Sequence, residues 1–190
     1  LAQDPRTSLA YAADPALFLW LEGQRLDLRT GPWFVYSPLL VHKAFRSGEI
    51  SVLNQRQYLL PDVHAFCRAD QRDEALAAFF RVASDGVRCL VGHDWLVNVD
   101  VTSSLRDRWP TLATDVTSWT GSHLRVSTSP DLIGYMAMRV AIGTSNGAGT
   151  VMLSNIQWDE VNGPRFGITD QDGTPVSVLH GTLFSGIAKA

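Results

Sequence analysis

The most informative stretch of the chain is GYMAMRVAIGTSNGAGTVMLSNIQW, residues 134–158. Its first half alternates apolar residues with polar or small ones, which is the period of a half-buried strand. The apolar positions are Met136, Met138, Val140 and Ile142. Residues 143–149 contain nothing bulky, and residues 150–158 are again rich in apolar side chains. The stretch therefore predicts two strands joined by a hairpin turn.

The turn of this hairpin also spells a catalytic motif. Residues 143–147 match G-x-S-x-G, the nucleophile elbow, and an aspartate and His180 follow in the chain order of the α/β-hydrolases. The elbow requires a strand that turns sharply into a helix, so that the serine hydroxyl is exposed. A strand pattern follows Gly147 instead, which favours a glycine-rich hairpin turn over a nucleophile at Ser145.

Outward from the hairpin, strand patterns recur about every 10–15 residues, which is typical of an all-β sandwich or barrel. The strongest lies at residues 95–101, and weaker ones lie at residues 16–21, 79–83 and 87–91. Residues 105–121 are expected to form a long irregular connection.

One helix is expected, at residues 38–47. Ser37 is a good N-cap, and Pro38 suits the first helical position, where its missing N–H costs nothing. Gly48 follows as a natural C-terminal stop.

Length and composition predict one domain, residues 1–190, with an N-terminal arm at 1–14 and a C-terminal extension at 164–190. The net charge is −3, with 16 Lys and Arg and no basic cluster. Proteins that neutralise many phosphates need clustered cations, so extensive nucleic-acid binding is disfavoured. No apolar stretch approaches the roughly 20 residues that span a bilayer, so no membrane partner is expected.

Metal and acid–base patterns are present but incomplete. His64-x-x-Cys67 offers two ligands, whereas zinc needs three or four, and positions i and i+3 of a strand face opposite sides. Cys89 and His93 have the same weakness. Asp62 and His64 form a possible acid–base pair of a kind that is common on surfaces. The sequence thus predicts no catalytic residue, cofactor or metal, and two free thiols.

Six tryptophans suggest contact surfaces. Trp109 and Trp119 fall in the expected irregular connection, where they are candidates for a subunit interface. Asn146, in the hairpin turn, is a candidate surface-loop residue. The tryptophans also leave open a sugar-binding platform, and hence a β-sandwich carbohydrate-binding module.

The order of these segments resembles the small coat proteins of comoviruses and related plant viruses. That family has a short strand, then Ser-Pro, then a helix that ends in a basic residue and Gly, and then another strand. The same order is found here in residues 33–36 and in SPLLVHKAFRSGEISV, residues 37–52. Residues 134–158 resemble the last two strands of the picornavirus-like jelly roll. The resemblance implies an all-β, eight-stranded jelly-roll sandwich with irregular terminal arms and one short helix at residues 38–47.

By the same resemblance, the chain would be a capsid protein cut from a polyprotein, which suits Leu1 as its first residue. It would assemble with sister coat proteins into an icosahedral shell in the host cytoplasm and reside in the virion. It would contact genomic RNA weakly or indirectly and would have no enzymatic activity. The carbohydrate-binding module and, less favoured, a serine hydrolase using Ser145 are the alternatives.

Overall fold

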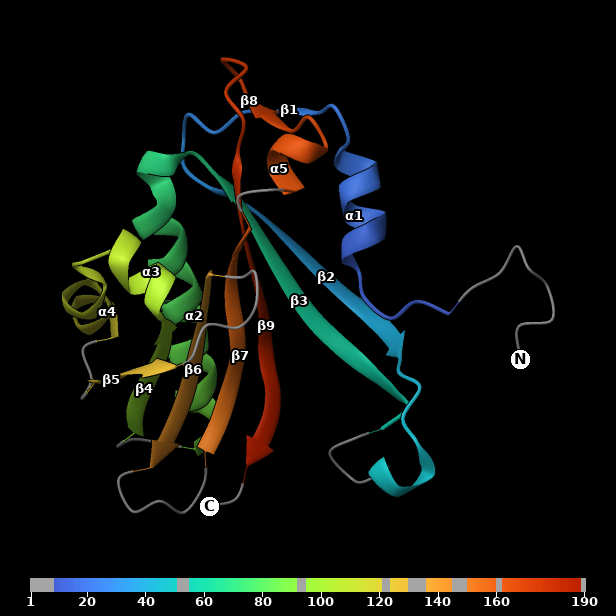
Figure 1. Ribbon diagram of the computed structural model, residues 1–190, viewed down its shortest axis with the longest axis vertical. Helices are drawn as coiled ribbons and strands as arrows, with labels where there is room; N and C mark the ends of the chain where they lie inside the picture. The colour runs from blue at the N-terminus through green and yellow to red at the C-terminus, as the bar shows by residue number, and fades with distance from the viewer. Residues whose placement is uncertain are drawn as a thin grey trace.

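A computed structural model describes residues 9–50, 55–91, 95–120, 124–129, 136–144, 150–159 and 162–188 (Figure 1). The helices, including two 3-10 turns (η), are α1 Asp14–Leu21, η1 Ser47–Glu49, η2 Ala69–Gln71, α2 Arg72–Val91, α3 Ser103–Arg108, α4 Leu112–Thr120 and α5 Asn162–Arg165. The strands are β1 Arg25–Leu26, β2 Trp33–His42, β3 Gln57–Cys67, β4 Trp95–Thr102, β5 Leu124–Ser129, β6 Met136–Thr144, β7 Thr150–Asp159, β8 Thr169–Asp170 and β9 Ser177–Ala188.

A mixed sheet of seven strands forms the centre of the fold, in the order β2-β3-β9-β7-β6-β4-β5 (Figure 1). Its neighbouring strands are antiparallel except β4 and β5, which are parallel. Helices pack on both faces: the Phe18 ring of α1 contacts His64 on one face, and Phe79 of α2 contacts Phe34 on the other. A jelly roll instead needs two antiparallel sheets packed together. The expected all-β jelly roll is therefore wrong, and the fold is mixed α/β.

The two strands expected within residues 134–158 are confirmed as β6 and β7, which pair antiparallel with Ile142 opposite Val151. The expected strand at residues 95–101 is confirmed as β4. Ser145 lies outside the described residues. The next described element after β6 is a strand, whereas a nucleophile elbow would place a helix there. The hydrolase interpretation loses its structural basis.

The helix expected at residues 38–47 is wrong, because residues 33–42 form β2, paired in register with β3. The His42 N–H donates to the Ala10 carbonyl at 2.8 Å, away from β3, so the backbone N–H groups of the even-numbered residues point outward. Pro38 occupies one of these outward positions on an edge strand, where its missing donor costs no ladder hydrogen bond. Edge-strand placement, and not helix capping, explains this proline.

Two segments expected as strands are helical. In α1, Pro15 lies in the first turn, and Leu17, Phe18 and Leu21 are buried on one side. In α2, 20 residues run through the expected strands at residues 79–83 and 87–91. Short apolar runs do not distinguish a buried helix from a strand, and only the length of the whole segment does.

Two other expectations of irregular structure also fail. Helices α3 and α4 lie in the connection expected at residues 105–121. The C-terminal segment, expected to be an irregular arm, supplies β9, which lies between β3 and β7 inside the sheet. Within the described residues, no helix combines the length and apolarity needed to cross a membrane.

A hydrophobic core lies between α1, the small parallel sheet of β1 and β8, and the end of the large sheet. Phe66 is fully buried there, with its ring centroid 6.3 Å from that of Phe18 and 6.0 Å from that of Trp33. The other buried members are Leu17, Leu21, Leu26, Leu28, Ile168, Val176 and Val178. This core holds α1 against the sheet and thereby positions Asp14, the first residue of α1.

Cys67, at the end of β3, is a free and buried thiol, as expected from the sequence. Burial raises its pKa to about 12. We expect its reaction with a disulfide reagent at pH 8 to be on the order of a thousandfold slower in the folded chain than in urea, because the thiolate is the nucleophile. The rate should be measured in a Cys89→Ser background, and equal rates in both states would contradict this burial.

Candidate metal centre

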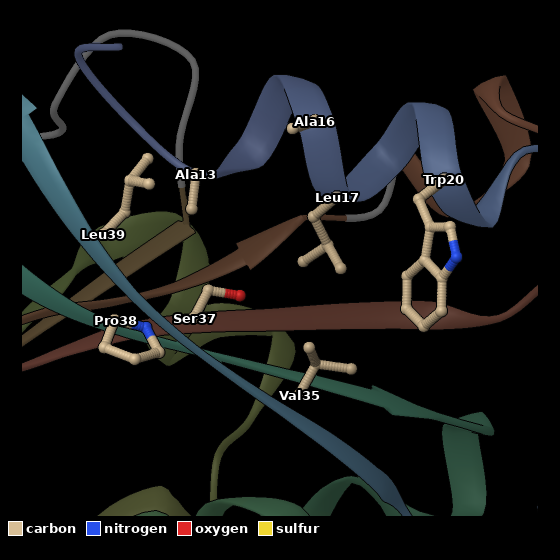
Figure 2. A pocket seen from close by; sticks show the side chains of 8 residues that line it. All are labelled: Ala13, Ala16, Leu17, Trp20, Val35, Ser37, Pro38 and Leu39. Atoms are coloured by element: carbon tan, nitrogen blue, oxygen red, sulfur yellow. The ribbon is translucent and has the colours of Figure 1, made fainter.

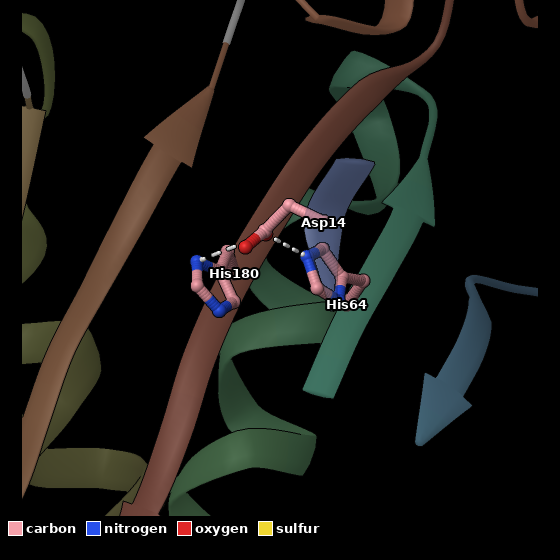
Figure 3. Close-up of side chains that lie close together, drawn as sticks. All are labelled: Asp14, His64 and His180. Carbon is pink, nitrogen blue, oxygen red and sulfur yellow. Dashed lines mark hydrogen bonds and ion pairs between the residues drawn. The ribbon is translucent and has the colours of Figure 1, made fainter. Parts of the chain in front are cut away.

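Three side chains that can bind a metal come from three separate elements and meet on the α1 side of the sheet (Figure 3). Asp14 begins α1, His64 lies in β3 and His180 lies in β9. Asp14 Oδ1 is 2.7 Å from His64 Nε2 and 3.8 Å from His180 Nδ1. One ligand atom from each residue lies within 4.8 Å of the others.

Strand pairing brings the two histidines together. His64 and His180 are direct partners in the β3–β9 register, so their side chains leave the same face of the sheet. Their rings stack with centroids 4.4 Å apart and planes 6° from parallel. The N-terminus of α1 then places Asp14 over the pair. The cluster is a product of the β3–β9 pairing and of the docking of α1.

The cluster combines a buried ligand with two partly exposed ones. The His64 side chain is fully buried, whereas those of Asp14 and His180 are 32% and 23% exposed. Burial acts to raise the pKa of Asp14, but the hydrogen bond with His64 and the nearby charges of both histidines outweigh it, so the pKa lies below its ordinary value. Asp14 is therefore ionised at neutral pH, as a metal ligand must be.

A second carboxylate lies behind His180. Asp62 is 1% exposed, and its Oδ1 lies 3.4 Å from His180 Nε2. Histidines that bind metals usually direct their other ring nitrogen at a carboxylate or carbonyl, which fixes the ring orientation. Asp62 occupies that supporting position, and it leaves Nδ1 of His180 directed towards Asp14.

Asp14 and His64 are within hydrogen-bond distance of each other, and small shifts of the three side chains would be needed to hold an ion between them. Zinc binds histidine nitrogen and carboxylate oxygen at about 2.0–2.2 Å, which places neighbouring tetrahedral ligands about 3.3 Å apart. The Asp14–His64 and Asp14–His180 separations, 2.7 and 3.8 Å, lie on either side of that value. Parallel rings cannot both direct lone pairs at one ion, so binding requires one ring to turn. His180 is the more exposed of the two rings, so it is the one that would turn, and its 3.4 Å contact with Asp62 would change as it does.

An open groove of about 340 Å³ runs beside the cluster, between α1 and β2 (Figure 2). It adjoins the cluster at two points: Ala13 precedes Asp14, and Val35 is the register partner of His64. Its polar groups are the Ser37 hydroxyl and the indole N–H of Trp20. The lining consists of Ala13, Ala16, Leu17, Trp20, Val35, Ser37, Pro38 and Leu39. The groove therefore suits an apolar group and offers no charge for recognition.

The residues singled out from the sequence lie elsewhere. Trp109 is 6% exposed, and its indole N–H donates to Asp115 Oδ2 at 2.9 Å. Trp119 lies in α4, and Asn146 lies outside the described residues. Their role as interface residues stays a prediction.

No sequence pattern indicates the cluster as a whole. The local patterns pair His64 with Cys67 or with Asp62, and they place His180 only at the end of a hydrolase-like order. The residue that completes the set, Asp14, is 50 positions from His64. No local spacing rule connects them, because the contact depends on the pairing of β3 with β9.

No known protein-family model matches the chain, and no curated protein matches its sequence. Solved structures do match its fold. The RNA-binding domain of threonyl-tRNA synthetase from Cryptosporidium parvum Iowa II aligns with 93% of this chain at a TM-score of 0.71 and 14% identity. A putative threonyl-tRNA synthetase, ThrRS-1, from Aeropyrum pernix aligns with 92% at a TM-score of 0.65 and 17% identity.

A third similar structure is prolyl-tRNA synthetase from Cryptosporidium parvum in complex with L-proline and AMP, with 96% of this chain aligned at a TM-score of 0.54 and 8% identity. The chain spans 47%, 44% and 36% of the lengths of these three structures. At such identities the similarity establishes the fold, which is one found in aminoacyl-tRNA synthetases.

This fold overturns the resemblance to comovirus coat proteins, because that resemblance rested on strand order in a jelly roll. The capsid function, the sister coat-protein and genomic-RNA partners, and the virion location were all inferred from the jelly roll, and they are wrong with it. The carbohydrate-binding β-sandwich fails for the same reason, since the structure has one large sheet flanked by helices. The single domain at residues 1–190 stays a prediction.

Proposed function

We propose that this chain is a ligand-binding domain of an aminoacyl-tRNA-synthetase-like protein, built around a divalent metal ion held by Asp14, His64 and His180. The observation that carries the proposal is the convergence of these three ligand atoms within 4.8 Å. Two imidazoles and one carboxylate form a set that suits zinc and other first-row transition metals.

The partial exposure of the cluster supports a binding role over a purely structural one. Structural zinc sites are closed by four protein ligands, whereas three ligands leave a position for a small molecule. Two of the three side chains here are partly exposed, so that position is reachable from solvent. A metal ion at this place would act as a Lewis acid that binds amine, hydroxyl or carboxylate groups of a ligand.

The groove beside the cluster supports a ligand with a polar end and an apolar part. The polar end would bind at the metal, and the apolar part would lie along Val35 and Leu17. An amino acid has this form, and the prolyl-tRNA synthetase of similar fold was solved with L-proline and AMP. We therefore propose an amino acid or a related small amine as the ligand. The expectation that the chain has no enzymatic activity stays a prediction.

Zinc titration of the metal-free chain tests the proposal. We expect one zinc ion per chain, measured by competition with a chromophoric chelator and by metal analysis after gel filtration. The His180→Ala variant should lose this binding while keeping its fold, because His180 is partly exposed. His42→Ala is the matched control: it removes another histidine, at the far end of β2, and should bind zinc like the unaltered chain. Equal binding by both variants would refute the site.

A further inference from the structure

Strand β2 lies at one end of the large sheet, and β3 pairs with only one of its two sides. On the outer side, the described residues make one backbone hydrogen bond, from the His42 N–H to the Ala10 carbonyl. The N–H and carbonyl groups of Phe34 and Tyr36 point the same way, because outward positions recur at every second residue of a strand. Within the described part of the chain, these two residues therefore present backbone donors and acceptors to an added strand.

The groove described above runs along this edge, with α1 as its second wall (Figure 2). Val35, Ser37 and Leu39 line it from β2, and they alternate with the outward-facing positions of that strand. Leu17 and Trp20 line it from α1. Residues that lie opposite each other on paired strands share a face, so an extended chain beside β2 would place every second side chain in the groove. The open edge and the groove thus fit the same occupant.

The backbone edge selects a polypeptide over other apolar ligands. Outward N–H and carbonyl groups recur about every 6.8 Å, twice the rise of about 3.4 Å per residue, and an extended backbone repeats its own donors and acceptors at the same spacing. A lipid chain or an aromatic molecule could fill the groove, but it would cover these groups without bonding to them, which is unfavourable. In recognition by strand addition, main-chain hydrogen bonds provide affinity and alternate side chains provide specificity.

Pro38 disfavours a second copy of the chain as the occupant. In a two-fold pairing of β2 with itself, the outward, even-numbered positions of the two copies would face each other. Any such register of more than two residue pairs within Trp33–His42 includes Pro38 of both copies. Because proline has no N–H, a carbonyl of the facing strand would lack its donor in each copy. A separate peptide can pair with Phe34 and Tyr36 and end before Pro38.

We propose that the outer edge of β2 binds a short extended peptide of a partner protein, which pairs with Phe34 and Tyr36 and places an apolar side chain against Leu17 and Trp20. The side chain that enters the groove is apolar because no charged residue lines it. About four main-chain hydrogen bonds and one inserted side chain predict a dissociation constant in the micromolar range or above. The apolar part of the proposed small ligand would share this groove, so peptide binding is measured without metal or ligand.

Selection from a displayed library of random octapeptides on the metal-free chain tests the proposal. Enriched peptides should contain apolar or β-branched residues at every second position and should bind the chain in fluorescence anisotropy. Tyr36→Pro should weaken this binding at least about tenfold, because it removes an outward N–H. Pairing with β3 does not use this N–H, as the Pro38–Pro61 pair of the same ladder shows. Tyr36→Ala is the matched control, since it keeps the N–H, and its affinity should stay within about threefold.

A second variant tests the groove without changing β2. Ala16 is exposed on α1 and lines the groove, so Ala16→Trp should fill the groove and weaken the peptide by a similar factor. His180→Ala should bind the peptide like the unaltered chain, so a failure of the metal site and a failure of the peptide site give different results.

Three results would overturn the proposal. The first is equal affinity of Tyr36→Pro and Tyr36→Ala for the selected peptides. The second is a library that yields no peptide enriched on the unaltered chain over the Tyr36→Pro variant. The third is a dimer of the unaltered chain in sedimentation velocity that Tyr36→Pro dissociates and Tyr36→Ala does not, which would assign the edge to a second copy.

Discussion

Replacing His64 with alanine is expected to lower the zinc affinity of the chain by on the order of a thousandfold. Loss of a partner that merely supports a ligand costs about 10–100-fold in metal affinity, and loss of a direct ligand costs more. His64 is the fully buried member of the cluster, hydrogen-bonded to Asp14 and stacked on His180, so its replacement removes a nitrogen ligand that the fold holds in place. Competition with a chelator of known affinity measures the change.

Because His64 is buried, its removal can also affect folding, and a second variant separates the two effects. Asp14→Ala removes a partly exposed ligand at the start of α1 and should produce a comparable loss of zinc affinity. Circular dichroism of both variants without metal should match the unaltered chain. Zinc affinity that is retained in a folded Asp14→Ala variant would exclude Asp14 as a ligand.

Replacing Phe66 with alanine is expected to lower the free energy of unfolding by about 3–5 kcal/mol, the usual cost of emptying a large aromatic site in a core. Phe66 has no exposed surface, and its ring contacts Phe18 of α1 and Trp33 of β2. The cavity would therefore loosen the docking of the helix that carries Asp14. Urea unfolding of the metal-free chain, followed by tryptophan fluorescence, measures the change.

Tyr36→Ala is the control for Phe66→Ala, because it removes an aromatic ring from the neighbouring strand at a position that is 58% exposed. Tyr36→Ala should lower the free energy of unfolding by less than about 1 kcal/mol, because substitutions at exposed positions usually change it by about 0.5 kcal/mol or less. Equal losses in the two variants would show that Phe66 is not part of a packed core.

Strong period-two segments were predictable from the sequence alone. Strands β6 and β4 follow from alternation over about seven residues, and β7 follows from a run rich in apolar side chains after a glycine-rich turn. Local hydrophobic periodicity is strongest in such segments, and no tertiary contact is needed to recognise them.

The errors arose where tertiary structure overrides local preference. The pair Ser37-Pro38 fits the start of a helix, and it fits equally well an edge strand whose proline faces outward. Only the pairing of β2 with β3 decides between these two structures. The strand patterns at residues 79–83 and 87–91 are separated by Ser84-Asp85-Gly86, which is typical of a turn but lies inside the helix α2. With these segments as strands the pattern is that of a β-sandwich, whereas the chain forms a seven-stranded sheet with helices on both faces.

The candidate site could not be predicted from spacing. Asp14 falls in the expected N-terminal arm at residues 1–14. In the structure it begins helix α1, and this helix directs its carboxylate at His64. His64 and His180 become neighbours only when the C-terminal segment inserts as β9 beside β3. The geometry of the site is therefore a consequence of long-range strand order, which single-sequence patterns do not contain.

X-ray absorption at the zinc edge of the zinc-loaded chain would show whether Asp14, His64 and His180 bind the metal. We expect a first shell of two imidazole nitrogens and oxygen ligands at about 2.0–2.2 Å. A sulfur ligand at about 2.3 Å, supplied by Cys67 or Cys89, or a chain that retains no zinc, would contradict it.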